Sequence, residues 1–219
     1  MIIIITGGIG QGKTLSIVKE IIDRQNNTFT NFKLYNAECT RLKYSHLFKE
    51  KEGKMKLNFS FWNEQTKKGN FDIYLDEFHN VMSSRRSMSK KNVLMSDWLS
   101  QIRKILGQTE QNHLYLLTQK LKRIDVNSRD LAHLAIKCEK QTLDNVTIPT
   151  EVNIKGQIQV KELPMTIIYK HYFQDADALD AYEKYGMNTK KLTTRFIGNW
   201  YYKYFDSYEL IDFGQADYV

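Results

Sequence analysis

The feature that most constrains this chain is a glycine-rich loop near its amino terminus, set between an apolar run and a helical pattern. Gly7 to Thr14 reads Gly-Gly-Ile-Gly-Gln-Gly-Lys-Thr and fills every fixed position of the phosphate-loop pattern G-x-x-x-x-G-K-[ST]. The run Ile2 to Ile5 before it is typical of a buried strand, and apolar residues recur at helical spacing from Leu15 to Ile22. The sequence therefore predicts a strand, a phosphate-binding loop and a helix in succession.

The composition of this loop suits a polyphosphate. Glycines let the backbone curl so that N–H groups point inward, and the helix that follows adds the positive end of its dipole. We expect Lys13 to contact the β- and γ-phosphates and the Thr14 hydroxyl to bind Mg²⁺. A glycine-rich turn without a ligand is the alternative, which the complete motif disfavours. The residues expected to hold ATP are Gly8, Ile9, Gly10, Gln11, Gly12, Lys13, Thr14 and Leu15.

An acidic pair follows a second apolar run. Phe71 to Leu75 reads as a buried strand, and Asp76 and Glu77 come directly after it. We expect Asp76 to hold Mg²⁺ through water and Glu77 to act as the general base on an attacking water. A strand-terminal acidic pair can also be purely structural. A small-molecule kinase would carry the same loop, but an Asp-Glu pair favours hydrolysis over transfer to a bound acceptor.

Composition narrows the class of protein. The formal charge of +7 over 219 residues is compatible with an anionic partner, although an ordinary basic surface gives the same figure. Cys39 and Cys138 are too few and too far apart to suggest a disulfide framework or a zinc site, so we expect a reducing compartment. No stretch has the length of a membrane span. The expected location is the cytoplasm, that of the host cell if the protein is viral.

The order of the predicted elements indicates an α/β fold. Strands are predicted at 28–32, 71–75 and 113–117 and a helix at 93–106, whereas the basic segment 41–56 is predicted as loop and helix. We expect a core over residues 1–140 and a C-terminal extension over 141–219, packed together as one structural domain.

The pattern of apolar residues changes in the predicted extension. Alternating apolar residues on either side of Lys155-Gly156 indicate a hairpin, 163–172 a further strand, and 176–185 a short helix.

A third set of residues carries a resemblance to a known family. Leu116-Leu117-Thr118-Gln119, followed by Ile124-Asp125 and Ser128 to Leu131, resembles the segment of the FtsK-HerA branch of P-loop ATPases in which a strand ends in Thr-Gln. Within that branch, four further features look like the zonular occludens toxin group, which includes the filamentous-phage assembly ATPases. They are Thr30-Asn31-Phe32, Arg85-Arg86, Gln101-Ile102-Arg103 and Thr118-Gln119.

The resemblance implies a fold and further site residues. The fold would be an additional-strand, RecA-like P-loop NTPase with a mostly parallel central sheet, flanking helices and a small C-terminal hairpin and helix extension. The Thr-Gln strand would lie between the strands that carry the loop and the acidic pair. Gln119 would sense the γ-phosphate and the attacking water, although a Gln at a strand end can simply cap backbone groups. Arg129 would stabilise the transition state, either within its own subunit or across a subunit boundary, with Arg85 and Arg86 as competitors.

The implied partners are ATP, double-stranded DNA, capsid or assembly proteins, and further copies of the chain in a hexameric ring. Arg85, Arg86, Lys90 and Lys91 are the expected DNA contacts, with Lys120, Lys122 and Arg123 as a second basic group; a solvated loop is the alternative for both. Toxin-group proteins usually continue into a transmembrane helix and an external domain. This chain has neither, which favours a genome-packaging motor, although a truncated protein would look the same. A virion assembly or extrusion ATPase and a non-hydrolysing nucleotide switch remain alternatives.

Overall fold

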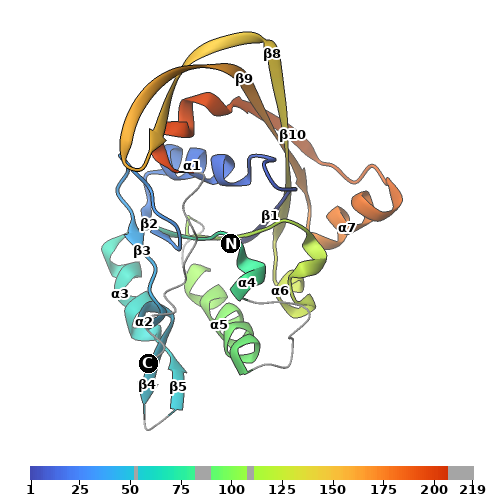
Figure 1. The fold of residues 1–219 in the computed structure, drawn as a ribbon. Helices are drawn as coiled ribbons and strands as arrows, with labels where there is room; N and C mark the ends of the chain where they lie inside the picture. The colour runs from blue at the N-terminus through green and yellow to red at the C-terminus, as the bar shows by residue number, and fades with distance from the viewer. Residues whose placement is uncertain (52–53, 82–89, 108–110, 207–219) are drawn as a thin grey trace.

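A single mixed sheet organises the chain (Figure 1). The computed structural model describes residues 1–51, 54–81, 90–107 and 111–206. The sheet has eight strands in the order β10-β9-β8-β1-β7-β6-β2-β3. Neighbours from β8 to β3 are parallel, while β8–β9 and β9–β10 are antiparallel. The strands are β1 (Ile2–Thr6), β2 (Asn27–Thr30), β3 (Thr40–Arg41), β6 (Phe71–Leu75), β7 (His113–Thr118), β8 (Leu134–Ile154), β9 (Gln157–Phe173) and β10 (Leu192–Ile197).

Helices cover both faces of this sheet, so the molecule has three layers (Figure 1). Since side chains alternate along a strand, Ile3 and Ile5 of β1 face the core on the α1 side, and Ile2 and Ile4 face the core on the α5 side. The helical segments are α1 (Lys13–Arg24), α2 (Tyr44–Leu47), α3 (Phe59–Lys68), α4 (Phe78–Val81), α5 (Lys90–Leu106), η2 (Leu121–Arg123), α6 (Val126–Asp130), α7 (Ala176–Tyr185) and η3 (Gly198–Tyr204).

The position of β7 confirms the fold class. This strand ends in Thr118 and lies between β1, which leads into the phosphate loop, and β6, which leads into Asp76. Such an inserted strand between the loop strand and the acidic strand is the additional-strand arrangement expected from the resemblance. The chain therefore has the fold of a P-loop NTPase.

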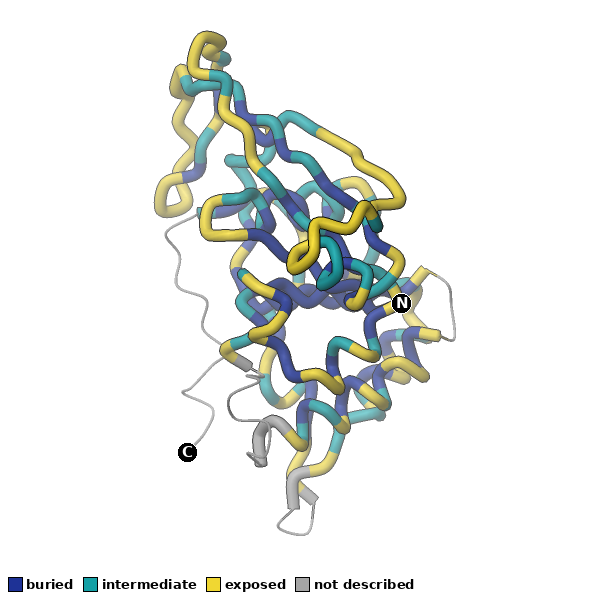
Figure 2. The backbone as a smooth tube through the Cα atoms, turned by 90° about the vertical axis from the view of Figure 1, so that its right-hand side faces the viewer, coloured by how far each residue is buried: buried dark blue, intermediate teal, exposed yellow. Residues whose placement is uncertain are grey.

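Strands β8 and β9 form a long hairpin that extends the sheet and arches over α1 (Figure 1). They are 21 and 17 residues long and pair from Ala135↔Phe173 to Ile154↔Gln157, with a register shift between Leu143 and Thr147. Figure 2 shows that the central strands are buried, whereas much of the hairpin is exposed or half-buried. The predicted turn at Lys155-Gly156 is confirmed. Residues 163–172 continue β9 instead of forming a separate strand, and β8 runs unbroken through residue 140.

The prediction for the basic segment 41–56 was incomplete. The segment contains α2, and then a two-stranded hairpin made of β4 (Phe48–Lys51) and β5 (Lys54–Leu57). Lys49 pairs with Lys56 in this hairpin. Like charges directly opposite each other are unfavourable, so a segment this basic is not typical of paired strands. The apolar base of the hairpin offsets this cost, because Phe48 is 2% exposed and packs into the core.

Candidate active site

Three of the four predicted catalytic residues lie at the carboxyl ends of three adjacent strands: Lys13, Glu77 and Gln119. Thr6 of β1 pairs with Thr118 of β7, and Leu75 of β6 pairs with Leu116. Each strand is followed at once by a polar segment: the phosphate loop after β1, Gln119 after β7, and the acidic pair after β6. Because parallel strands end at one edge of the sheet, their registers bring segments far apart in sequence to a single site.

Lys13 opens α1 and folds back over the loop. Its Nζ donates to the carbonyl oxygens of Gly7 at 2.9 Å and Gly8 at 3.2 Å, and the residue is only 7% exposed. An ammonium group has three protons, so one remains for a phosphate oxygen. The predicted role of Lys13 as a phosphate ligand fits this geometry and stays a prediction.

The β8–β9 hairpin forms a wall against the loop. Gly12 has φ 81°, in the left-handed region, and a Cβ there would lie 2.4 Å from Cδ1 of Ile168 on β9. On β8, the backbone N–H of Lys140 donates to Oε1 of Gln11 at 2.9 Å. Ile9, by contrast, is 82% exposed. The loop is thus fixed on the hairpin side and open to solvent at Ile9, and no sequence motif signalled the part that the hairpin plays.

A hydrogen bond joins the loop to the acidic pair. The Thr14 hydroxyl donates to Oδ2 of Asp76 at 2.9 Å, and the backbone N–H of Glu77 donates to Oδ1 at 2.7 Å. Asp76 is 4% exposed, and burial raises the pKa of its carboxyl group above the ordinary value, while the two hydrogen bonds act in the opposite direction.

These oxygen atoms fit a magnesium ion. Hydroxyl and carboxylate oxygens are the ligands that Mg²⁺ takes, and it usually keeps several waters and binds substrate phosphates in addition. Among the described residues, no group of three His, Cys, Asp or Glu side chains could hold a metal alone. Thr14 and Asp76 would therefore supply the protein's share of the ligands, and the bound ion would neutralise charge on the phosphates.

Asn31 holds the backbone of Asp76 in place. Its side-chain nitrogen donates to the Asp76 carbonyl oxygen, and its side-chain oxygen accepts from the Asp76 backbone N–H, each at 2.8 Å. Asn31 is 1% exposed and directly follows β2. Thr30-Asn31-Phe32 contributes to the sequence resemblance, but the motif itself indicates no role for Asn31.

Glu77 and Gln119 contact each other across the site. Nε2 of Gln119 lies 3.4 and 3.5 Å from the two carboxylate oxygens of Glu77. Glu77 has φ 48°, an uncommon value for a residue with a side chain, and such backbone strain often occurs at functional sites. The structure thus brings the predicted base beside the predicted sensor. His79 also contacts Glu77, and Arg123 contacts Gln119; no sequence motif indicated either contact.

The remaining predicted residues are either away from this site or outside the described residues. Arg129 lies in α6 with its Nε atom buried, and no hydrogen bond or ion pair seen among the described residues joins it to the loop or the acidic pair. Its role across a subunit boundary stays a prediction. Arg85 and Arg86 lie outside the described residues, and Lys90 and Lys91 begin α5 with their side chains outside the description. Their proposed DNA contacts likewise stay predictions.

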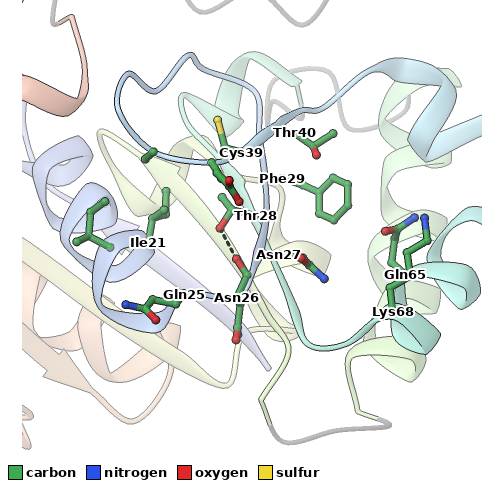
Figure 3. A pocket seen from close by; sticks show the side chains of 13 residues that line it. Ile21, Gln25, Asn26, Asn27, Thr28, Phe29, Cys39, Thr40, Gln65 and Lys68 are labelled. Carbon is green, nitrogen blue, oxygen red and sulfur yellow. Dashed lines mark hydrogen bonds between the residues drawn. The ribbon is translucent and has the colours of Figure 1, made fainter.

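A cavity of about 870 Å³ lies away from this site (Figure 3). It is lined by the C-terminal end of α1, the strand β2 and the helix α3, represented by Gln25, Thr28 and Gln65. A helix of this length spans about 18 Å, so the cavity and the phosphate loop lie at opposite ends of α1. None of the predicted catalytic residues lines it.

No protein-family model matches the chain, and no curated protein matches it. Solved structures do match at the level of fold. The N-terminal domain of zonular occludens toxin from Neisseria meningitidis is 19% identical, with a TM-score of 0.48 over 90% of this chain and 92% of that one.

A second match is the genome packaging NTPase B204 from Sulfolobus turreted icosahedral virus 2 in complex with ATP-gammaS. It is 12% identical, with a TM-score of 0.40 over 62% and 73% of the two chains. The DNA-packaging ATPase B204 from Sulfolobus turreted icosahedral virus is 16% identical, with a TM-score of 0.39 over 62% and 74%. Both kinds of protein that the sequence resembles are thus among the matches.

Proposed function

We propose that this protein is an Mg²⁺-dependent ATPase that moves double-stranded DNA, most specifically in viral genome packaging. The observation that carries the hydrolytic part is the 2.9 Å hydrogen bond from Thr14 to Asp76, which unites the phosphate loop with the acidic pair in one site. Glu77 and Gln119 lie beside each other at the same strand ends. Phosphoryl transfer to water requires a phosphate ligand, a metal site and a general base close together, so this arrangement supports the proposal.

In this mechanism each residue has a separate role. Lys13 and the loop N–H groups bind the phosphates, and Thr14 and Asp76 hold the metal ion that neutralises their charge. Glu77 takes a proton from the attacking water, and the Nε2 group of Gln119 donates to the water or to the γ-phosphate. Arg129 from a neighbouring subunit would stabilise charge in the transition state.

The DNA part of the proposal rests on the ordered sequence resemblance and on net charge. A formal charge of +7 favours association with a polyanion. Within the described residues, no helix is long and apolar enough to cross a membrane. A virion assembly or extrusion ATPase remains the alternative within the same class, and a nucleotide-dependent switch is the alternative outside it.

The test is steady-state ATP hydrolysis with and without long double-stranded DNA, at low salt and at about 0.2 M salt, where phosphate contacts weaken. Stimulation by DNA that is lost at the higher salt supports a translocating motor. Turnover that is indifferent to DNA at both salt concentrations supports the assembly ATPase instead. Tight ATP binding without turnover supports the switch and contradicts the proposed hydrolysis.

A further inference from the structure

Glu77, the predicted base, and three further side chains form a closed ring of polar contacts. Gln119 lies 3.4 Å from Glu77, and an Arg123 guanidinium nitrogen donates to Oε1 of Gln119 at 2.6 Å. The same nitrogen of Arg123 lies 3.4 Å from Nε2 of His79, and Nδ1 of His79 lies 3.2 Å from Glu77. The ring thus runs from Arg123 through two separate side chains to one carboxylate.

The chemistry of Arg123 and Glu77, which lie opposite each other in the ring, fixes which atoms donate and which accept. A guanidinium group can only donate hydrogen bonds, and a carboxylate can only accept them. The oxygen of the Gln119 amide must therefore face Arg123, which leaves the amide nitrogen to face Glu77. An unanchored amide could present either atom, so the contact with Arg123 selects the donor.

The same argument fixes the tautomer of His79. Its Nε2 faces the Arg123 donor and must accept, so the proton resides on Nδ1, which lies 3.2 Å from the Glu77 carboxylate. The Thr118 hydroxyl lies 3.5 Å from the same nitrogen but donates to the Lys120 carbonyl oxygen, so it does not supply a proton to Nδ1. Burial lowers the pKa of His79, with the Glu77 carboxylate opposing it, which favours the neutral ring that this arrangement requires. His79 lies in α4, immediately after the acidic pair, so the backbone brings it to this position.

We propose that Arg123 is a positioning residue for hydrolysis, which sets the direction of this ring so that Gln119 and His79 both donate to the Glu77 carboxylate. The inference rests on the proposed function, in which Glu77 is the base. Gln119 then presents a donor, suited to a phosphate oxygen or a carboxylate, and not an acceptor. Arg123 itself is exposed on η2 and acts only through its two neighbours.

The competing explanation is that Arg123 is a surface cation that contacts DNA phosphates. Lys120, also exposed and three positions earlier, is the matched control because its replacement removes the same charge from the same segment. Lys120 has no described contact with the ring. DNA contact predicts that both residues affect stimulation by DNA and neither affects turnover without DNA.

The kinetic experiment measures DNA-free ATP hydrolysis by the full chain. Arg123→Met should lower kcat about 10- to 100-fold, the range common when a group that orients an active-site residue is removed, with KM and ATP affinity within about two-fold. Lys120→Met should leave kcat unchanged, and Arg123→Lys should recover part of the loss, since an ammonium group can still donate. In a Gln119→Met background, the further loss from Arg123→Met should be much smaller. An unchanged kcat in Arg123→Met, or full additivity, overturns the proposal.

A second measurement does not depend on turnover. The ¹⁵N shifts of the His79 ring, assigned with His79→Gln, report which nitrogen carries the proton. The neutral ring should be protonated on Nδ1 in the natural sequence and in Lys120→Met, and should lose that preference in Arg123→Met. Protonation on Nε2 in the natural sequence overturns the proposal even if the protein is an active ATPase. Conversely, an Nδ1 proton in a protein without turnover refutes hydrolysis and leaves the ring intact.

Discussion

The Thr14 hydroxyl donates a hydrogen bond of 2.9 Å to Oδ2 of Asp76, across 62 positions of sequence. The phosphate loop and the acidic pair are therefore parts of one preformed arrangement, each fixed by further contacts of its own. Preorganisation of this kind matters for catalysis because charges that are already in place need not reorganise during the reaction. It also means that individual residues of the site can be tested for separate roles.

Lys13→Ala and Glu77→Gln should separate binding from chemistry. Loss of the Lys13 ammonium removes a phosphate ligand, so ATP affinity should fall strongly. Glu77→Gln keeps the shape of the side chain and removes the base, so kcat should fall by about 10² to 10⁴ with ATP affinity nearly unchanged. Isothermal titration with ATP and steady-state kinetics check both. An equal loss of affinity in the two variants would contradict the division of roles.

Asn31→Ala should destabilise the fold through the backbone of Asp76. The change leaves one buried N–H and one buried carbonyl unpaired, which should lower the free energy of unfolding by about 2 to 4 kcal/mol. Urea unfolding followed by circular dichroism measures this. Asn63→Ala, on the exposed surface of α3, is the control and should change stability by less than about 0.5 kcal/mol. Equal effects of the two changes would count against the role assigned to Asn31.

Gly12→Ala should be more damaging than Gly10→Ala, although both glycines have positive φ. The strain of a left-handed alanine is about 1 to 2 kcal/mol at either position. A Cβ at Gly10 has no atom within 4 Å, whereas one at Gly12 would overlap Ile168. Overpacking adds about 1 to 3 kcal/mol, so the two unfolding free energies should differ by that amount.

An Ile168→Ala change tests the origin of that difference. It should relieve the crowding in Gly12→Ala and leave the backbone strain, so the double variant should lose less than the sum of the single losses. If the stability losses of the two single variants simply add, contact with Ile168 is not the cause of the extra loss in Gly12→Ala.

Acid should destabilise the protein through His113. Burial, reinforced by the Arg24 guanidinium and opposed by Asp72, lowers the pKa of this buried ring to about 4. Between the ordinary value near 6.5 and that value, the unfolded chain binds a proton that the folded chain does not. The free energy of unfolding should therefore be highest above pH 6.5 and fall by up to about 3 kcal/mol as the pH drops toward 4.

His113→Gln tests this pH dependence. The variant should show a flatter dependence of unfolding free energy between pH 4 and 6.5, measured by urea titrations at several pH values. His46→Gln is the comparison, because His46 is only half-buried and burial lowers its pKa in the same direction. It should leave most of the slope. A slope unchanged in His113→Gln would refute the assignment.

The sequence predicted the centre of the sheet best because its signals there are local. The apolar runs of β1, β6 and β7 each end at a polar residue, so both the strands and their carboxyl ends could be located. Helix α7 agrees with its prediction at both ends, since Asp175 caps it and Gly186 ends it. The length of β8 and β9 was not predictable in the same way, because exposed, polar strand residues carry little periodic signal.

The site shows the same division between local and tertiary signals. Lys13, Thr14, Asp76, Glu77 and Gln119 belong to motifs with fixed spacing, and all five come together at one edge of the sheet. Asn31 contacts this set only through the tertiary fold. His79 and Arg123 are close in sequence to Glu77 and Gln119, but the tertiary fold brings them to each other, so spacing alone could not identify them. The direction of the ring around Glu77 needs atomic geometry, since it follows from which nitrogen or oxygen faces which partner.

Because the β8–β9 hairpin packs against the phosphate loop, it limits which fragments of the chain could fold on their own. Ile168 covers Gly12, and Lys170 of the same strand is 3% exposed and forms an ion pair with Glu20 of α1. A fragment ending at residue 140 would lose both residues and would leave α1 without much of its cover. We expect that the segment carrying the phosphate loop is not an autonomous folding unit. The shape of the loop would then depend on residues synthesised more than 140 positions later, and the loop should become ordered only after β9 has been made.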